Sequence, residues 1–299
     1  MKFGYFCNTT NWDHKPYNQL LKETQEITTY CDENNWDSIW YTEHHFNHEG
    51  MESCTNPLMM GVDAAARTKQ IRIGQACNVI TFHNPIRLAE DIALLDQLSD
   101  GRVDVGIGRG IYGREAINMN KEADLKDQAK NFRLFDESLT IMKKAWTEKF
   151  FSHQGEFYNY PTPGFNWQHD MSPPSEEFLD TKTNEIKKIS IVPKPKQLPH
   201  PPIWQVVDGA RSIEWAAQNG LNTIMWIPTV KALKNRFEIY RDAKSKAENR
   251  DVPLGEGISL VRDMFVAETM EEAEKLASEH IINYMKWVCH WRGLGNHMD

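Results

Sequence analysis

The sequence lacks any apolar run of the roughly 20 residues needed to cross a bilayer. Its first residues, MKFGYFCNTT, also lack the apolar core of a signal peptide. No cluster of Lys and Arg is present and the formal net charge is -8, so there is no basic surface to replace the counterions of a phosphate backbone. We therefore expect a cytoplasmic protein that binds neither membrane nor nucleic acid.

Cysteine is scarce and scattered, which argues against disulfides and against a structural zinc site. The five cysteines are Cys7, Cys31, Cys54, Cys77 and Cys289. They form no CxxC pair and no pair with histidines at zinc-finger spacing. We expect reduced thiols that mostly fill the core, and no metal.

What the sequence does contain is an alternation of short β-rich runs with longer segments of helical period, which favours parallel strands joined by helical crossovers. Its 299 residues suit one barrel domain, 1–299, since such a barrel uses about 250. The expected strands are 2–6, 38–43, 71–79, 102–108, 203–207, 222–227 and 257–267. The expected helices are 17–34, 56–68, 84–100, 127–149, 210–219, 230–247 and 270–285. The predicted fold is an α/β (β/α)8 barrel of the TIM type.

Two stretches depart from this pattern. Residues 150–202 hold too many prolines for regular elements and too few apolar residues for a second core, so we expect an irregular excursion with at most a short strand or two, such as KKISIV. The second departure is that only seven units can be counted, although a closed barrel needs eight strands. The final GLGNHMD resembles neither strand nor capped helix. We expect that the eighth βα unit is missing because the C-terminus is truncated.

In such a barrel the residues that follow the strands form the active site. After the second strand comes Glu43-His44-His45-Phe46, which offers an imidazole able to exchange protons near neutral pH. Alternation along the chain sends the two rings in different directions, so one is expected to face the cavity while the other packs elsewhere. A purely structural role for the histidines is the competing interpretation.

The fourth strand, RVDVGIGRG, places Gly106 and Gly108 on its inner face. Missing side chains there either open a cavity or let a flat ligand approach the backbone, or they merely relieve crowding or mark a bulge. The sequence leaves both interpretations open.

The turn Asp208-Gly209-Ala210-Arg211-Ser212 stands where a strand passes into a helix. Its backbone N–H groups and the positive helix end could bind a phosphate, and Arg109 could add a bidentate contact. Alternatively, the turn is an ordinary helix cap and the arginines form surface ion pairs.

At these residues the sequence resembles the bacterial luciferase-like monooxygenases. The resemblance runs through MKFGYF, WYTEHHF, GQACNVITFHNPIRLAEDIALLDQLSDGRVDVGIGRG and WAAQNG, and is weak between about residues 160 and 199. It implies reduced FMN delivered by a separate flavin reductase, reaction with O₂ to a C4a-hydroperoxide, and oxygenation of a small apolar organic substrate. That chemistry requires a dry pocket.

The resemblance also assigns roles to residues. It implies that His44 is the catalytic histidine and that Arg109 binds the flavin phosphate. The turn of Asp208, Gly209, Ala210, Arg211 and Ser212 would complete the phosphate site through the N–H groups of Gly209 and Ala210 and the Ser212 hydroxyl. Ala76 and Cys77 match a pair joined by a non-prolyl cis peptide beside the flavin. Gly108 stands where luciferase has a reactive cysteine and Asp208-Gly209 replaces a Glu-Ser pair, so light emission is not implied.

Two other functions remain in competition. One is an F420-dependent oxidoreductase with the same barrel, against which EHHF argues, and the other is a non-catalytic flavin-binding partner subunit, against which His44 and Arg109 argue. The substrate stays open among aldehyde oxidation, Baeyer-Villiger oxidation and hydroxylation. By analogy we expect a dimer that pairs through the helices after the second and third strands.

Overall fold

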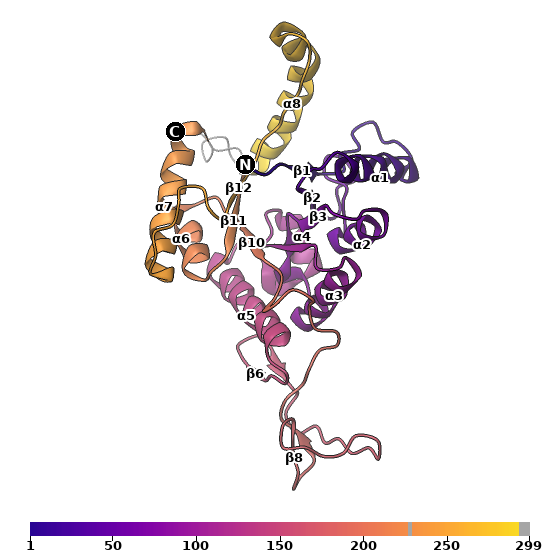
Figure 1. Ribbon diagram of the computed structural model, residues 1–299, viewed down its shortest axis with the longest axis vertical. Helices are drawn as coiled ribbons and strands as arrows, with labels where there is room; N and C mark the ends of the chain where they lie inside the picture. Colours follow the sequence, from indigo (N-terminus) through magenta and orange to yellow (C-terminus); the bar gives the residue numbers. More distant parts are fainter. Residues whose placement is uncertain (227–228, 293–299) are drawn as a thin grey trace.

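The computed structural model describes residues 1–226 and 229–292, which form a parallel sheet wrapped by helices (Figure 1). The hydrogen-bonded strand order is β1-β2-β3-β5-β10-β11-β12, with the short β4 also paired to β5. These strands are β1 Gly4–Cys7, β2 Ser38–Tyr41, β3 Arg72–Gln75, β4 Asn78–Val79, β5 Val103–Gly108, β10 Ile203–Val206, β11 Asn222–Trp226 and β12 Ile258–Val261. All pairs are parallel, as the alternating sequence pattern predicted. The α/β barrel fold is thereby confirmed.

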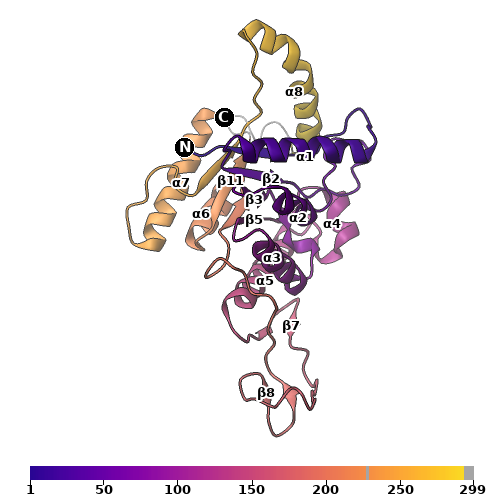
Figure 2. The ribbon, with the colours of Figure 1, turned by 45° about the vertical axis from the view of Figure 1, so that its right-hand side comes forward.

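Most helices lie between strands that follow one another in the sequence and cover the outer side of the sheet, whereas α8 follows β12 and projects away from it (Figures 1 and 2). They are α1 Tyr17–Glu33, α2 Pro57–Arg67, α3 Pro85–Leu98, α4 Gly113–Met119, α5 Gln128–Thr147, α6 Ala210–Gln218, α7 Val230–Glu248 and α8 Met270–Arg292. Short 3₁₀ turns occupy Ile80–Phe82 (η1) and Lys121–Ala123 (η2). The sequence pattern did not indicate α4 or the 3₁₀ turns, and α8 ends later than expected.

Capping residues explain why several helices begin where the sequence predicted. Asn56 accepts a hydrogen bond from the Met59 N–H, and Asn84 accepts from the N–H groups of Ile86 and Arg87. In both cases proline occupies the first helical position, where no N–H is needed. Each cap thus fixes the residue at which its helix begins.

The expected continuous strand 71–79 is wrong in one respect. β3 pairs with the start of β5 through Ile73 and Val103, whereas β4 pairs with its end through Asn78 and Ile107. Between them the Ala76–Cys77 peptide bond is cis, so the ladder is interrupted there. After the interruption, Asn78 and Val79 pair in parallel alongside the carboxyl end of β5.

The two glycines of β5, Gly106 and Gly108, leave room for Gln75 and Cys77 of the neighbouring segment. A Cβ on Gly106 would lie 1.5 Å from the Gln75 carbonyl oxygen, and one on Gly108 would lie 2.2 Å from Cys77 Sγ. The space that the glycines leave is therefore filled by the neighbouring strand. The relief of crowding, one of the two interpretations of these glycines, is confirmed, and the interpretation that they open a cavity is wrong.

The hydrophobic core lies mainly between β5, β10, β11 and the helices outside them. Val103, Val105 and Ile107 are buried in it together with Phe135, Met142 and other side chains of α3 and α5. On the opposite face of β5, Asp104 forms an ion pair with Arg72 and accepts a hydrogen bond from Trp204 Nε1. The period-2 alternation of this strand is thus confirmed.

Residues 150–202 form a finger that projects away from the barrel (Figures 1 and 2). Its regular parts are two antiparallel pairs, β6 His153–Gln154 with β7 Asn159–Tyr160 and β8 Leu179–Asp180 with β9 Glu185–Ile186. KKISIV is not a strand, because only Ile189 pairs, in an isolated bridge with Phe151. The rest of that segment has no neighbouring strand to pair with among the described residues.

The last unit is shorter than predicted in its strand and longer in its helix. β12 ends at Val261, and α8 extends to Arg292. In the strand order β1 and β12 are the two end strands, so the expectation of a missing eighth unit stays a prediction. Position 227, expected at the end of a strand, and the final residues 293–299 lie outside the described residues. No described helix combines the length and the apolar character needed to cross a membrane.

Candidate active site

The residues predicted for the site follow strands that are neighbours in one parallel sheet. Glu43, His44 and His45 follow β2, the Ala76–Cys77 pair follows β3, Arg109 follows β5, and the turn 208–212 follows β10. Because the strand order includes β2-β3-β5-β10, these segments share the carboxyl-end rim of the sheet.

His44 lies between two buried carboxylates. Its Nδ1 is 3.3 Å from Glu115 Oε1, and its Nε2 is 3.6 Å from Glu52 Oε2. The ring also packs at 5.3 Å, centroid to centroid, against Tyr112, and the side chain is only 12% exposed. An imidazole with a carboxylate at each nitrogen can hold a proton or pass it on without leaving the pocket.

His45 points to a different acid, as strand alternation predicted. Its Nε2 lies 3.0 Å from Glu43 Oε1, and His83 Nε2 lies 2.8 Å from the same oxygen. Glu43 Oε2 accepts the Val79 N–H at 2.7 Å. The cluster of Glu43, His45 and His83 thus connects the loop after β2 to β4 and to the loop before α3.

The pKa values of the cluster follow from these contacts. Burial would raise the pKa of Glu43, but hydrogen bonds from His45 and His83, and the charge of His83, hold it below its usual value of 4.5. Burial would lower the pKa of His83, but its hydrogen bond to Glu43 and the negative charge there raise it above 6.5. The cluster is therefore a buried ion pair at mildly acidic pH.

Arg109 is held by neutral groups. Its Nη1 donates to Asn131 Oδ1 at 3.4 Å and to the Gln128 carbonyl oxygen at 3.5 Å, and its Cζ lies 5.7 Å from the Phe132 ring centroid. Burial lowers its pKa, and the positive charge of Arg211 nearby lowers it further. Within the described residues neither arginine forms an ion pair with a carboxylate. Arg211 is thus near enough for its positive charge to act on Arg109.

The turn 208–212 begins α6, with Gly209 as the N-cap. The N–H groups of Ala210 and Arg211 meet no backbone acceptor in the part of the chain that the structure describes. A Cβ on Gly209 would meet nothing within 4 Å, so the space before the helix is open. The Ser212 hydroxyl donates to the Gly209 carbonyl oxygen at 2.8 Å, so it would have to rotate to serve a phosphate.

The Ala76–Cys77 bond is cis, as the family resemblance implied. Cys77 Sγ occupies the space into which a side chain at position 108 would extend. The rim beside β5 thus carries a sulfur atom even though position 108 is glycine, because the sulfur comes from the neighbouring segment.

Besides Glu52 and Tyr112 beside His44 and Phe132 beside Arg109, four further contributors were not predicted from the sequence. Glu115 lies on the unexpected α4, Asn131 on the buried side of α5, and His83 in the loop before α3. The fourth is Tyr284 of α8, whose hydroxyl accepts from Asn8 Nδ2 at 2.9 Å and donates to Glu52 Oε1 at 3.3 Å. Of these four, only His83 could have been predicted from the sequence. Like His44 it follows a strand, and it stands directly before the helix cap Asn84.

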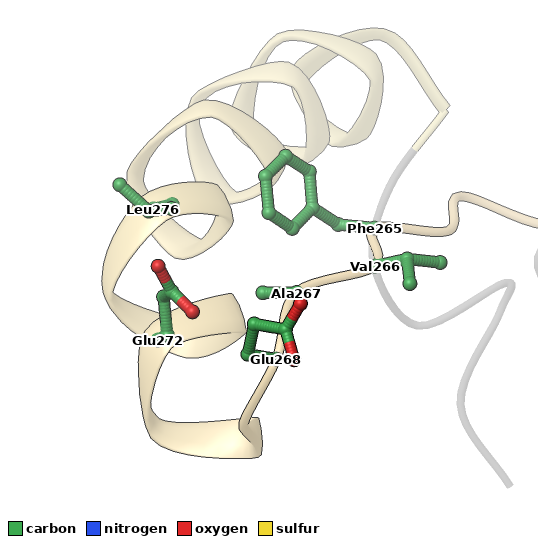
Figure 3. Close-up of a pocket in the computed structure, with 6 residues that line it drawn as sticks. All are labelled: Phe265, Val266, Ala267, Glu268, Glu272 and Leu276. Atoms are coloured by element: carbon green, nitrogen blue, oxygen red, sulfur yellow. The ribbon is translucent and has the colours of Figure 1, made fainter.

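Away from these residues, an open hollow of about 420 Å³ lies between the segment after β12 and the first turns of α8 (Figure 3). Its lining is Phe265, Val266, Ala267, Glu268, Glu272 and Leu276, none of which was predicted for the site. No group of three or more His, Cys, Asp or Glu in the described part of the chain is arranged to hold a metal ion.

The fold is a parallel α/β barrel, and histidine, carboxylate and arginine side chains gather on one rim, as in barrel enzymes. Comparison with known proteins identifies the family. The model of the family described as luciferase-like monooxygenase matches residues 1–298. The chain belongs to this family.

Individual relatives agree with that assignment. The oxygenase component of the flavin-dependent trigonelline monooxygenase of Acinetobacter baylyi is 29% identical over 95% of this chain and 70% of its own length. The alkanal monooxygenase alpha chain of Photorhabdus laumondii is 28% identical over 81% of this chain and 58% of its own. The chain thus spans only about 58–70% of these relatives.

A solved structure agrees in fold. The oxygenating constituent of 3,6-diketocamphane monooxygenase from Pseudomonas putida, a type II Baeyer-Villiger monooxygenase solved with FMN, superposes with a TM-score of 0.80. It is 22% identical, and the match covers 99% of this chain and 77% of that one.

Proposed function

We propose that this chain is the oxygenase component of a two-component monooxygenase, which takes reduced FMN from a separate flavin reductase and uses O₂ to oxygenate a small apolar organic substrate. Bound reduced FMN would supply the activation of O₂. The proposal treats residues 1–299 as one barrel domain. The name "oxygenase component" of the trigonelline relative supports a separate reductase.

The residues present fit a flavin phosphate. The charge of Arg211 acts on Arg109, neither arginine has a carboxylate partner among the described residues, and the first N–H groups of α6 lie beside the open space at Gly209. A dianionic phosphate would relieve the repulsion between the two guanidinium groups and accept the helix N–H groups. Ala76 and Cys77, which follow β3 between the strand ends that carry His44 and Arg109, would face the flavin ring.

His44 would hold or move a proton at its Nε2 or Nδ1 while Glu115 and Glu52 keep the ring in place. Their burial and the packing of Tyr112 exclude water from the imidazole, so that proton exchange with solvent is slowed. The single observation that carries the proposal is this sheltered histidine on the same rim as an arginine pair without acidic partners.

The test is oxygen uptake. Protein mixed with photoreduced FMN, air-saturated buffer and a panel of aldehydes, ketones and aromatic compounds should consume O₂ and form product with at least one of them. Absence of product with every compound, combined with tight binding of F420, would instead identify an F420-dependent oxidoreductase. Tight FMN binding without product from any compound would indicate a non-catalytic flavin-binding subunit.

We also propose that the chain forms a dimer through α2 and α3. These helices pack side by side and expose Met59 and Val62 on the first, and Leu94 and Leu98 on the second. The relatives include both alpha and beta chains of alkanal monooxygenase, which supports an assembly of similar chains. An apolar face of this kind on paired helices is suited to a symmetric interface.

A further inference from the structure

Asn131 is positioned so that only its oxygen can face Arg109. The side chain is fully buried, and its Nδ2 donates both to the Ala123 carbonyl oxygen at 3.0 Å and to the Arg109 carbonyl oxygen at 3.2 Å. Both amide hydrogens are thereby used. Reversal of the amide would set its oxygen against two carbonyl oxygens, so Oδ1 is fixed toward Arg109 Nη1.

Phe132, the next residue of α5, supports the guanidinium from its flat side. The Arg109 Cζ lies 5.7 Å from the ring centroid, within cation-π range. The ring itself is held edge-on by Trp215 of α6 at 5.4 Å. Phe132 thus connects Arg109 to the helix whose first turn carries Arg211.

The groups around Arg109 differ from those around three arginines that form ion pairs. Arg72 pairs with Asp104, Arg114 with Glu49 and Arg133 with Glu156. A carboxylate partner neutralises a guanidinium, whereas an amide oxygen and an aromatic ring position it and leave its charge in place. Arg109 is therefore oriented in advance and still carries an unneutralised charge for an anion.

We propose that Asn131 and Phe132 are positioning residues that hold Arg109 for a terminal phosphate, and that they thereby make the site select FMN over riboflavin. The inference rests on the proposed function, because it assumes that a flavin binds on this rim. It goes beyond it by assigning the phosphate preference to two α5 side chains that contact Arg109.

The experiment compares the affinities for FMN and riboflavin, measured by quenching of flavin fluorescence. Phe132→Leu should weaken FMN binding about 3- to 30-fold, the range of a partly buried cation-π contact, and leave riboflavin binding unchanged. Phe132→Tyr keeps the ring and should restore the preference. Asn131→Ala should act in the same direction, and Phe132→Leu keeps the test available if that variant does not fold.

A matched control is Phe150→Leu, because Phe150 lies 5.4 Å below Lys149 in a second cation-π pair on the finger. It should alter neither affinity. Equal weakening of FMN and riboflavin by Phe132→Leu would show a merely structural role and overturn the inference. If Arg109→Ala keeps the FMN preference, the phosphate site of the proposed function itself is wrong, so the two failures are distinguishable.

Discussion

The missing side chain of Gly106 is replaced by the main chain of Gln75, whose carbonyl oxygen would lie 1.5 Å from a Cβ at that position. The carboxyl end of β5 and the segment after β3 are therefore in backbone contact. This contact sets the path of Ala76 and Cys77 over the rim.

Gly106→Ala should destabilise the fold by at least about 3 kcal/mol, because the clash is with backbone and no side chain can move away. Gly113→Ala, where a Cβ would meet nothing within 4 Å, should change the free energy of unfolding by no more than about 1 kcal/mol. Urea unfolding of both variants provides the comparison. Equal stability of the two would contradict the backbone contact.

His44→Ala should lower the rate of substrate oxygenation by roughly 10²- to 10⁴-fold, the usual contribution of a positioned acid-base group. FMN affinity should stay unchanged, because the phosphate site lies elsewhere on the rim. His48→Ala is the control, since His48 lies in the same loop but its side chain is 84% exposed. Initial rates of product formation and flavin titrations separate the two effects.

Arg109→Ala should weaken FMN binding about 10- to 100-fold, as expected for a charge-assisted hydrogen bond to phosphate. The dependence of FMN affinity on salt concentration should also become shallower, because one ionic contact is lost. Arg87→Ala removes an exposed arginine paired with Asp91 and should change neither quantity. Binding isotherms at several salt concentrations measure both.

The Glu43–His83 pair should make stability depend on pH with a maximum at mildly acidic values. Glu43 has a lowered pKa, so its contribution is present above pH 4.5 and lost as pH falls through its folded-state value. His83 has a raised pKa, so its contribution is full below pH 6.5 and lost as pH rises through its folded-state value.

The difference in unfolding free energy between parent and Glu43→Gln should therefore be largest between pH 4.5 and 6.5. Urea titrations across that range measure it. Glu122→Gln, which removes an exposed partner of Lys130, should give a small difference that hardly varies with pH. A constant difference for Glu43→Gln would show that the pair does not titrate as described.

Leu94→Lys should weaken dimerisation, because it places a charge in the proposed α2–α3 interface. Leu254→Lys, at a leucine that is 54% exposed on the loop after α7, should leave association unchanged. Sedimentation velocity over a range of protein concentrations distinguishes the two. A parent chain that stays monomeric at high concentration would eliminate the proposed interface.

The sequence predicted the order and approximate bounds of the repeating units because their signals are local. Asn56-Pro57 and Asn84-Pro85 start helices through caps and prolines that act within a few residues. The break between β3 and β4 depends instead on contact with Gly106 and Gly108, residues about thirty positions further along the chain. Such a contact leaves no trace in the period of the strand itself.

The candidate site also has residues that the sequence predicted and residues that only the structure reveals. His44 and Arg109 were identified by their position after strands, which the unit pattern supplies. Glu115 approaches His44 across 71 residues of sequence, and Asn131 approaches Arg109 across 22. Glu115 lies on α4, which the sequence pattern did not indicate, and Asn131 lies on α5, whose amphipathic pattern looks like ordinary packing. Their roles emerge only once the helices are placed against the rim.

The bridge between Phe151 and Ile189 brings the two arms of the finger together before the chain returns to β10. The residues beyond that bridge form a closed loop. Each doubling of the length of such a loop costs only about 0.6 kcal/mol in chain entropy. Length and composition beyond the bridge can therefore change with little effect on the sheet. A change in the finger beyond the bridge thus leaves the rim that carries His44 and Arg109 in place.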